Sequence, residues 1–219
     1  MTLAAVAAWL VWGPGAGGGE RGGEGCTEVI VWHVGQVDPR FGISEEDLWN
    51  AVDGAARMWE AGAGRTLFLH RPGQGMVVEL TYDARQRQLQ ARLDEEERLR
   101  AQADRLQEGR AYARDVERFE AAVEAYSETP LRAFQAGEYS HSRHTLTGRI
   151  SQRRIRIFAV ADAAHLQTTL AHEMGHALEL NHVATSGAVM SAEEQVARRG
   201  VPQLTPADLD ELFRVCEVD

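Results

Sequence analysis

Residues 172–182 read His-Glu-Met-Gly-His-Ala-Leu-Glu-Leu-Asn-His, a short stretch that holds three imidazoles and a carboxylate beside them. On an α-helix, His172 and His176 are four positions apart, so both rings leave the same face and can bind one ion. Glu173 lies beside that face and can reach a metal-bound water without being a ligand. Zinc binds neutral imidazole well, and a catalytic zinc keeps three protein ligands and one open position. The pattern predicts a zinc site with His182 as the candidate third ligand.

The position of His182 sets a condition on the chain. It follows His176 by six residues, which is about 9 Å along a straight helix, whereas a zinc–nitrogen bond is only about 2.0–2.1 Å. We therefore expect the helix to end between the two histidines and the chain to turn back. An alternative third ligand is a more distal glutamate, Glu193 or Glu194. Those residues lie in Ala-Glu-Glu-Gln, which is typical of a solvated helical turn, so His182 is preferred.

The segment resembles the H-E-x-x-H-x-x-G-x-x-H pattern of the metzincin proteases. One position departs, because Glu179 stands where the family has glycine. Met190 follows at the offset of the family's Met-turn, whose methionine forms an apolar floor under the zinc. The short run to Met190 is similar to that of the matrixin branch, and the opening residues 31–41 resemble bacterial matrixin-like proteins. The resemblance implies a zinc metalloendopeptidase that cleaves peptide or protein substrates.

In the mechanism that this resemblance implies, His172, His176 and His182 hold Zn²⁺, which lowers the pKa of its bound water and polarises the scissile carbonyl. Glu173 takes the water's proton as general base and passes it to the leaving amine. A different class of function is a zinc-stabilised interaction module that acts through a long helix and has lost hydrolysis or acts on a non-peptide substrate. Glu179 hints at that alternative, and the intact Glu173 argues against it.

The implied fold is α+β: a twisted mixed sheet with an active-site helix and a Met-turn. Apolar alternation and β-branched residues predict four strands. Capping residues and 3.6-residue periodicity predict three helices, of which the second carries the zinc motif. The expected strands are residues 28–34, 66–70, 76–82 and 153–160, and the expected helices begin at Ser44, His165 and Thr205. Residues 76–82 are expected to be the edge strand that pairs with an extended peptide over the cleft.

Residues 84–126 consist almost entirely of strong helix formers without proline, and we interpret them as an insertion in the catalytic domain. Leu99, Leu106 and Ala113 recur every seven residues, as in a coiled coil. One straight helix of this length would be about 65 Å long. It must therefore fold back near Gly109 as a hairpin or pair with another chain. The segment either presents a solvated face, covers the cleft or recruits a partner.

Composition indicates a folded protein with a net charge of −10, which excludes nucleic acid as a partner. The apolar run 3–12 is too short to span a bilayer, which takes about 20 residues. It is similar to the core of a signal peptide. We interpret residues 1–25 as a leader and Gly-rich tether, and residues 26–83 and 127–219 as the catalytic domain of a secreted or extracytoplasmic protein.

The chain has two cysteines, Cys26 and Cys216, which bracket this domain. Domain termini often lie close together, so a disulfide between them is expected in an exported protein. Four further imidazoles are not expected to bind metal. His33 is interpreted as a structural strand residue, and three others as solvated residues: His141, His144 and His165.

Overall fold

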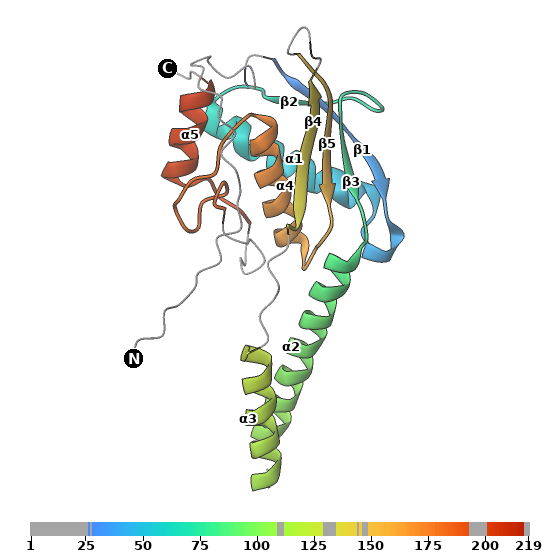
Figure 1. The fold of residues 1–219 in the computed structure, drawn as a ribbon, viewed down its shortest axis with the longest axis vertical. Coiled ribbons are helices and arrows are strands. Elements are labelled where there is room, and N and C mark those ends of the chain that lie inside the picture. Colours follow the sequence, from blue (N-terminus) through green and yellow to red (C-terminus); the bar gives the residue numbers. More distant parts are fainter. Residues whose placement is uncertain are drawn as a thin grey trace, which may run out of the picture.

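The computed structural model describes residues 26, 28–108, 112–128, 135–143, 145, 149–192 and 201–216 (Figure 1). It contains a five-stranded mixed sheet with helices packed on one face, which confirms the α+β class. In chain order the elements are β1 (Ile30–Val37), the 3-10 helix η2 (Pro39–Phe41), α1 (Glu45–Ala63), β2 (Phe68–His70), β3 (Met76–Leu80), α2 (Ala84–Glu108), α3 (Ala113–Glu128), β4 (Gly137–Arg143), β5 (Ile150–Ile157), α4 (Ala163–Ala177) and α5 (Pro206–Cys216).

The strand order is β2-β1-β3-β5-β4, and only β4 runs antiparallel to its neighbour. Side chains alternate between the two faces of the sheet. Val78 and Ile155 lie side by side in the register of β3 and β5 and are completely buried on the face that carries α1 and α4. The intervening Glu79 and Arg154 form an ion pair of 3.0 Å on the other face. One face of the sheet thus belongs to the core, and the other is polar.

The expected first helix is confirmed as α1, and its two ends explain its length. Ser44 and Asp47 form a reciprocal capping box at the start, and Gly64 adopts a left-handed conformation at the end. Between them, Trp59 is completely buried, and its indole N–H donates to the carbonyl oxygen of Ala171 in α4 at 2.8 Å. This bond ties α1 to the helix that carries the predicted zinc motif.

The sheet corrects the expected position of the edge strand. The segment expected at the edge is β3, which pairs with β1 on one side and β5 on the other and is therefore central. The outermost strand on that side of the sheet, beyond β5, is β4, which the sequence did not predict. Its residues read Gly-Glu-Tyr-Ser-His-Ser-Arg, without the apolar alternation of a half-buried strand. An edge strand with little burial leaves no such pattern, so the expectation of four strands was wrong.

Helices α2 and α3 pack against each other as a hairpin that projects away from the sheet (Figure 1). Leu99 is buried between them, and the guanidinium of Arg92 lies over the ring of Tyr126, 3.2 Å from its centroid. This arrangement agrees with the predicted fold-back near Gly109, a residue outside the described ranges. The coiled coil that the heptad spacing suggested is not supported.

The base of the hairpin belongs to the body of the domain. The side-chain amide of Gln86 donates to the carbonyl oxygen of Val160 at 3.1 Å and accepts from its N–H at 2.7 Å. Leu89 is completely buried, and the guanidinium of Arg85 lies over the ring of Phe158. The first turns of α2 therefore stabilise the body, although the sequence placed them in an insertion that begins at residue 84.

The disulfide predicted from the sequence is present. Cys26 and Cys216 are bonded, with Cα atoms 5.0 Å apart, and both are buried. The guanidinium of Arg65 donates to the carbonyl oxygens of both cysteines, at 2.8 and 3.3 Å. The start of the described chain is thereby fixed against the end of α5. Among the residues that the structure describes, no helix is both long and apolar enough to cross a membrane.

Candidate metal centre

Helix α4 presents two histidines on one side, and the chain beyond it returns a third. The Nε2 atoms of His172 and His176 are 3.1 Å apart, and Nε2 of His182 lies 3.2 Å from each of them. Three nitrogens on a tetrahedral ion with bonds of 2.0–2.1 Å would be separated by about 3.3–3.4 Å. The three nitrogens are thus spaced to form one face of a tetrahedral site. The alternative ligands Glu193 and Glu194 lie outside the described residues.

Hydrogen bonds determine which ring nitrogen faces the shared site. Nδ1 of His172 lies 2.7 Å from the carbonyl oxygen of Val189, and Nδ1 of His176 lies 3.1 Å from that of Leu180. A carbonyl only accepts, so each Nδ1 carries the proton and each Nε2 offers its lone pair to a metal. Burial lowers the pKa of His176, which favours the neutral form that binds metal.

The chain reverses through a left-handed residue directly after α4. Glu179 has φ of 66°, its N–H donates to the carbonyl oxygen of His176, and the N–H of Leu180 donates to that of Gly175, both at 3.0 Å. Together these bonds form a Schellman motif, which ends a helix and satisfies its last carbonyl groups. The prediction that the helix ends between His176 and His182 is confirmed.

Two arginines from the sheet brace this turn. Arg143, at the end of β4, donates to the carboxylate of Glu179 at 2.8 Å. Arg153, in β5, donates to the carbonyl oxygen of Ala177 at 2.9 Å, where a cation also interacts favourably with the C-terminal end of the helix. The glutamate that stands in place of the expected glycine therefore has a specific partner on the edge strand.

Met190 lies directly against the helix that bears the histidines. It is completely buried, and a Cβ atom built on Gly175 would be only 2.3 Å from its sulfur. The N–H of Val183 donates to the carbonyl oxygen of Met190 at 2.9 Å, which closes the loop that follows the third histidine. The glycine in α4 thus permits the close packing of helix and methionine. The role of Met190 as an apolar floor stays a prediction.

Asp208 anchors the same loop through a contact that could not be predicted from the sequence. Its buried carboxylate accepts from the N–H of Val189 at 3.0 Å and from that of Met190 at 2.8 Å. It also accepts from the N–H and hydroxyl of Thr205, both at 2.8 Å, as a helix cap. The helix cap that Asp208 forms with Thr205 has a local sequence pattern, whereas its contacts with Val189 and Met190 have none. Since the carbonyl of Val189 holds His172, Asp208 is connected to the histidine site through one residue.

Glu173 is buried between α4 and β4. It is 3% exposed, and its Oε2 atom has no partner among the described residues. Burial raises the pKa of Glu173 from 4.5 to about 7, an effect that the backbone N–H of Tyr139 opposes by donating to the carboxylate. Since Oε2 is free, we place this bond on Oε1. A bound cation nearby would stabilise the carboxylate and lower its pKa.

The remaining imidazoles have different environments. His165 is only 1% exposed, so its interpretation as a solvated residue was wrong; its Nδ1 accepts from the N–H of Ala161 at 3.1 Å. It is a core residue at the start of α4. His141 is exposed on β4, as expected, and its ring lies 5.5 Å from that of Tyr139. His144 lies outside the described residues.

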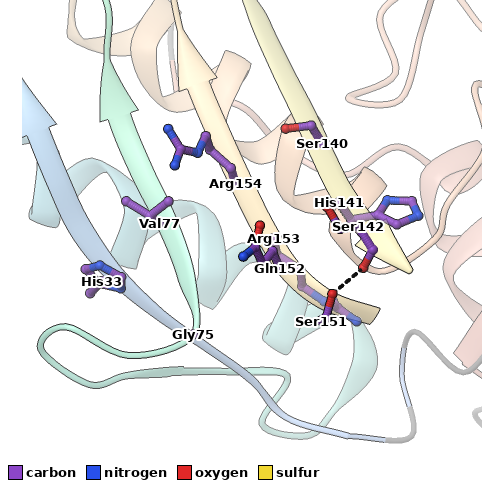
Figure 2. Close-up of a pocket in the computed structure, with 10 residues that line it drawn as sticks. All are labelled: His33, Gly75, Val77, Ser140, His141, Ser142, Ser151, Gln152, Arg153 and Arg154. Atoms are coloured by element: carbon purple, nitrogen blue, oxygen red, sulfur yellow. Dashed lines mark hydrogen bonds between the residues drawn. The ribbon is translucent and has the colours of Figure 1, made fainter. Parts of the chain in front are cut away.

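A pocket of about 450 Å³ lies on the polar face of the sheet, away from α4 (Figure 2). Its floor is a row of neighbouring residues on four strands: His33, Val77, Arg154 and Ser140. Nδ1 of His33 lies 2.8 Å from the carbonyl oxygen of Gln74, which agrees with a structural role for this histidine. The residues that line the pocket do not include the three clustered histidines, so the pocket is separate from the metal centre.

The donor set at the end of α4 fits zinc. Three neutral imidazoles offer their nitrogens in tetrahedral spacing, and the unpartnered carboxylate oxygen of Glu173 lies on the same helix. Zinc accepts such a set and keeps a fourth position for water or substrate. The three rings would hold the ion, and Glu173 would remain free to handle protons.

Replacing Glu179 with glycine is expected to leave zinc affinity unchanged and stability equal or higher by up to about 2 kcal/mol. Glycine removes the left-handed penalty of about 1–2 kcal/mol, whereas loss of the exposed ion pair with Arg143 costs about 0.2–1 kcal/mol. Thermal unfolding and zinc titration of Glu179→Gly test this. Glu179→Gln is the control, because it keeps the backbone penalty and removes the charge. A marked loss of zinc affinity in either variant would mean that the carboxylate supports the site directly.

Comparison with known proteins identifies a family. A sequence model for the family described as Matrixin matches residues 27–214, which include every element from β1 to α5 except the last two residues of that helix. No curated protein matched the chain.

Proposed function

Because the chain belongs to the matrixin family and is a zinc endopeptidase with a three-histidine zinc site, we propose that Glu173 is its general base. The observation that carries the proposal is the buried Oε2 of Glu173, which has no partner among the described residues. A purely structural zinc site has no use for such a carboxylate. Zinc, when bound, lowers the pKa of water toward about 7 and polarises the scissile carbonyl.

In the proposed reaction, Oε2 of Glu173 accepts the proton of the attacking water and then passes it to the leaving amine. The backbone N–H of Tyr139 in β4 donates to the same carboxylate. His172 and His176 hold their Nε2 atoms toward the site because their Nδ1 atoms are bonded to carbonyl oxygens.

We propose β4 as the strand to which an extended substrate adds. It is the outermost strand beside α4, and its residues Gly137 and Tyr139 adjoin Glu173. Peptides commonly bind an exposed sheet edge through main-chain hydrogen bonds. This assignment replaces β3, which the sheet leaves without a free edge.

The proposed activity can be tested on a mixed library of unmodified peptides, with cleavage products identified by mass spectrometry. Wild-type protein should release fragments cut at internal peptide bonds. Glu173→Gln, purified in the same way, should contain zinc and release fragments about 10²–10⁴-fold more slowly. Equal rates of release by the two proteins would remove Glu173 from the mechanism, and the absence of release by wild-type protein would contradict the proposed peptide hydrolysis.

The interpretation of residues 84–126 as an insertion remains a proposal. We also propose that the hairpin is a contact surface for a partner protein or a second copy of the chain. Three large apolar side chains are exposed, one directly before α3 and two within it: Tyr112, Val116 and Val123. The base of the hairpin contacts Val160, before the start of α4, whereas the zinc ligands lie toward its end. We therefore expect the hairpin to leave the cleft uncovered.

Removing residues 97–123 and joining the ends with a short Gly/Ser link is expected to leave folding, zinc binding and cleavage of short peptides unchanged. The deletion retains Gln86, Leu89 and the Arg92–Tyr126 contact, which the body and the hairpin base require. Rates on a short peptide and the elution volume on size exclusion check the result. Faster cleavage would show that the hairpin covers the cleft, and a product that fails to fold would show that the whole hairpin supports the core.

We also propose that the protein acts outside the cytoplasm. The Cys26–Cys216 disulfide suits an oxidising compartment. The segment interpreted as a leader, residues 1–25, lies outside the described residues, so the proposal is supported by the disulfide and by the apolar run in the sequence.

A further inference from the structure

Strand β4 approaches α4 unusually closely at Gly137. A Cβ atom on this residue would lie 2.8 Å from Cγ2 of Thr169 and 2.9 Å from both Cγ and Oε1 of Glu173. Carbon atoms do not approach one another so closely in native packing, so a side chain here would force a displacement. Both neighbours are only 3% exposed and have little room to withdraw.

The backbone does not explain the glycine. Gly137 is not among the residues with positive φ, and it pairs in regular register with Ile157 of β5. An alanine could adopt the same backbone conformation without strain. The contact with Glu173 and Thr169 is therefore the feature that excludes a side chain.

The same contact holds the carboxylate of Glu173 in place. Gly137 packs against Cγ and Oε1, and the N–H of Tyr139, two residues along β4, donates to the carboxylate. Oε2 is left without a partner among the described residues. One oxygen is thus fixed by the strand, while the other is available for a proton.

We propose that Gly137 is a positioning residue for the general base: its missing side chain lets β4 close on α4 and fix the orientation of the Glu173 carboxylate. This inference rests on the proposed function of Glu173. A misplacement of a reacting group by about 1 Å can lower the rate by about 10²-fold. The effect of a substitution at Gly137 should appear in kcat, because the zinc ligands and the outer edge of β4 remain.

The test is a double-mutant cycle on a short peptide substrate. Gly137→Ala is expected to lower kcat by about 10–100-fold, with KM and zinc affinity within about threefold of wild type. In the Glu173→Gln background, the same change is expected to have no further effect on residual hydrolysis. A wild-type kcat for Gly137→Ala, or an equal loss in both backgrounds, would overturn the inference. Full activity of Glu173→Gln would instead overturn the proposed function.

Two controls separate positioning from general damage to the fold. Gly62→Ala introduces a similar crowding, 2.7 Å from Cδ1 of Leu204, between α1 and the segment leading to α5. It should lower the melting temperature and leave kcat unchanged. If Gly137→Ala alone does not fold, Gly137→Ala/Thr169→Ser removes Cγ2 and keeps the hydroxyl that donates to His165. This pair is still expected to have low kcat, because the contact with Glu173 persists, and wild-type kcat would contradict the inference.

Discussion

Glu173→Ala is expected to lower kcat/KM for peptide hydrolysis by about 10²–10⁴-fold, the usual contribution of a general acid–base group. Zinc content and fold should be kept, because carbonyl oxygens hold His172 and His176 and the turn after α4 places His182, and none of these contacts involves Glu173. Steady-state kinetics on one peptide, with zinc quantified in the same samples, gives both quantities.

Glu173→Gln is the matched control for packing. It preserves the size of a side chain that is buried against Gly137 and removes its capacity to accept a proton. Equal losses in Glu173→Ala and Glu173→Gln would assign the effect to proton transfer. A Gln variant with wild-type activity would show that the carboxylate only fills space.

Asp208→Ala is expected to lower the free energy of unfolding by about 3–5 kcal/mol. Its carboxylate accepts from the buried N–H groups of Val189 and Met190, and each unsatisfied buried donor costs about 1–3 kcal/mol. For a domain of this size, a loss of 1 kcal/mol lowers Tm by about 2–4 °C. The loss should therefore be plain in a thermal melt.

Zinc affinity of Asp208→Ala should also fall, by about tenfold, because the carbonyl of Val189 orients the ring of His172. Asp210→Ala, an exposed position on the same helix, is the control and should alter stability by less than about 0.5 kcal/mol. A stable Asp208→Ala variant with normal zinc affinity would mean that the Met190 loop does not depend on this carboxylate.

The parts of the site that could be predicted from the sequence are those encoded by local spacing. His172 and His176 follow from helical periodicity, and the position of His182 required the helix to end before it. Each inference needed only residues within a few positions of one another.

The parts that could not be predicted depend on contacts between distant segments. Asp208 reaches Met190 across 18 positions, and Arg153 reaches the end of α4 across 24. Strand β4 is polar and half exposed, so it lacks the alternation by which strands are recognised, and the free edge was assigned to apolar β3 instead. The burial of His165 could not be predicted, because the burial of a polar side chain depends on tertiary packing and not on neighbouring residues in the sequence.

Peptide hydrolysis is expected to depend on one zinc ion that the three histidines hold. The most direct test is to measure zinc content and peptide cleavage on the same sample before chelation, after it and after zinc is returned, in wild type and in His182→Ala. Wild-type protein should contain about one zinc per chain, and its cleavage should disappear on chelation and return with zinc. His182→Ala should bind zinc weakly. Cleavage that persists without zinc, or tight zinc binding by His182→Ala, would contradict it.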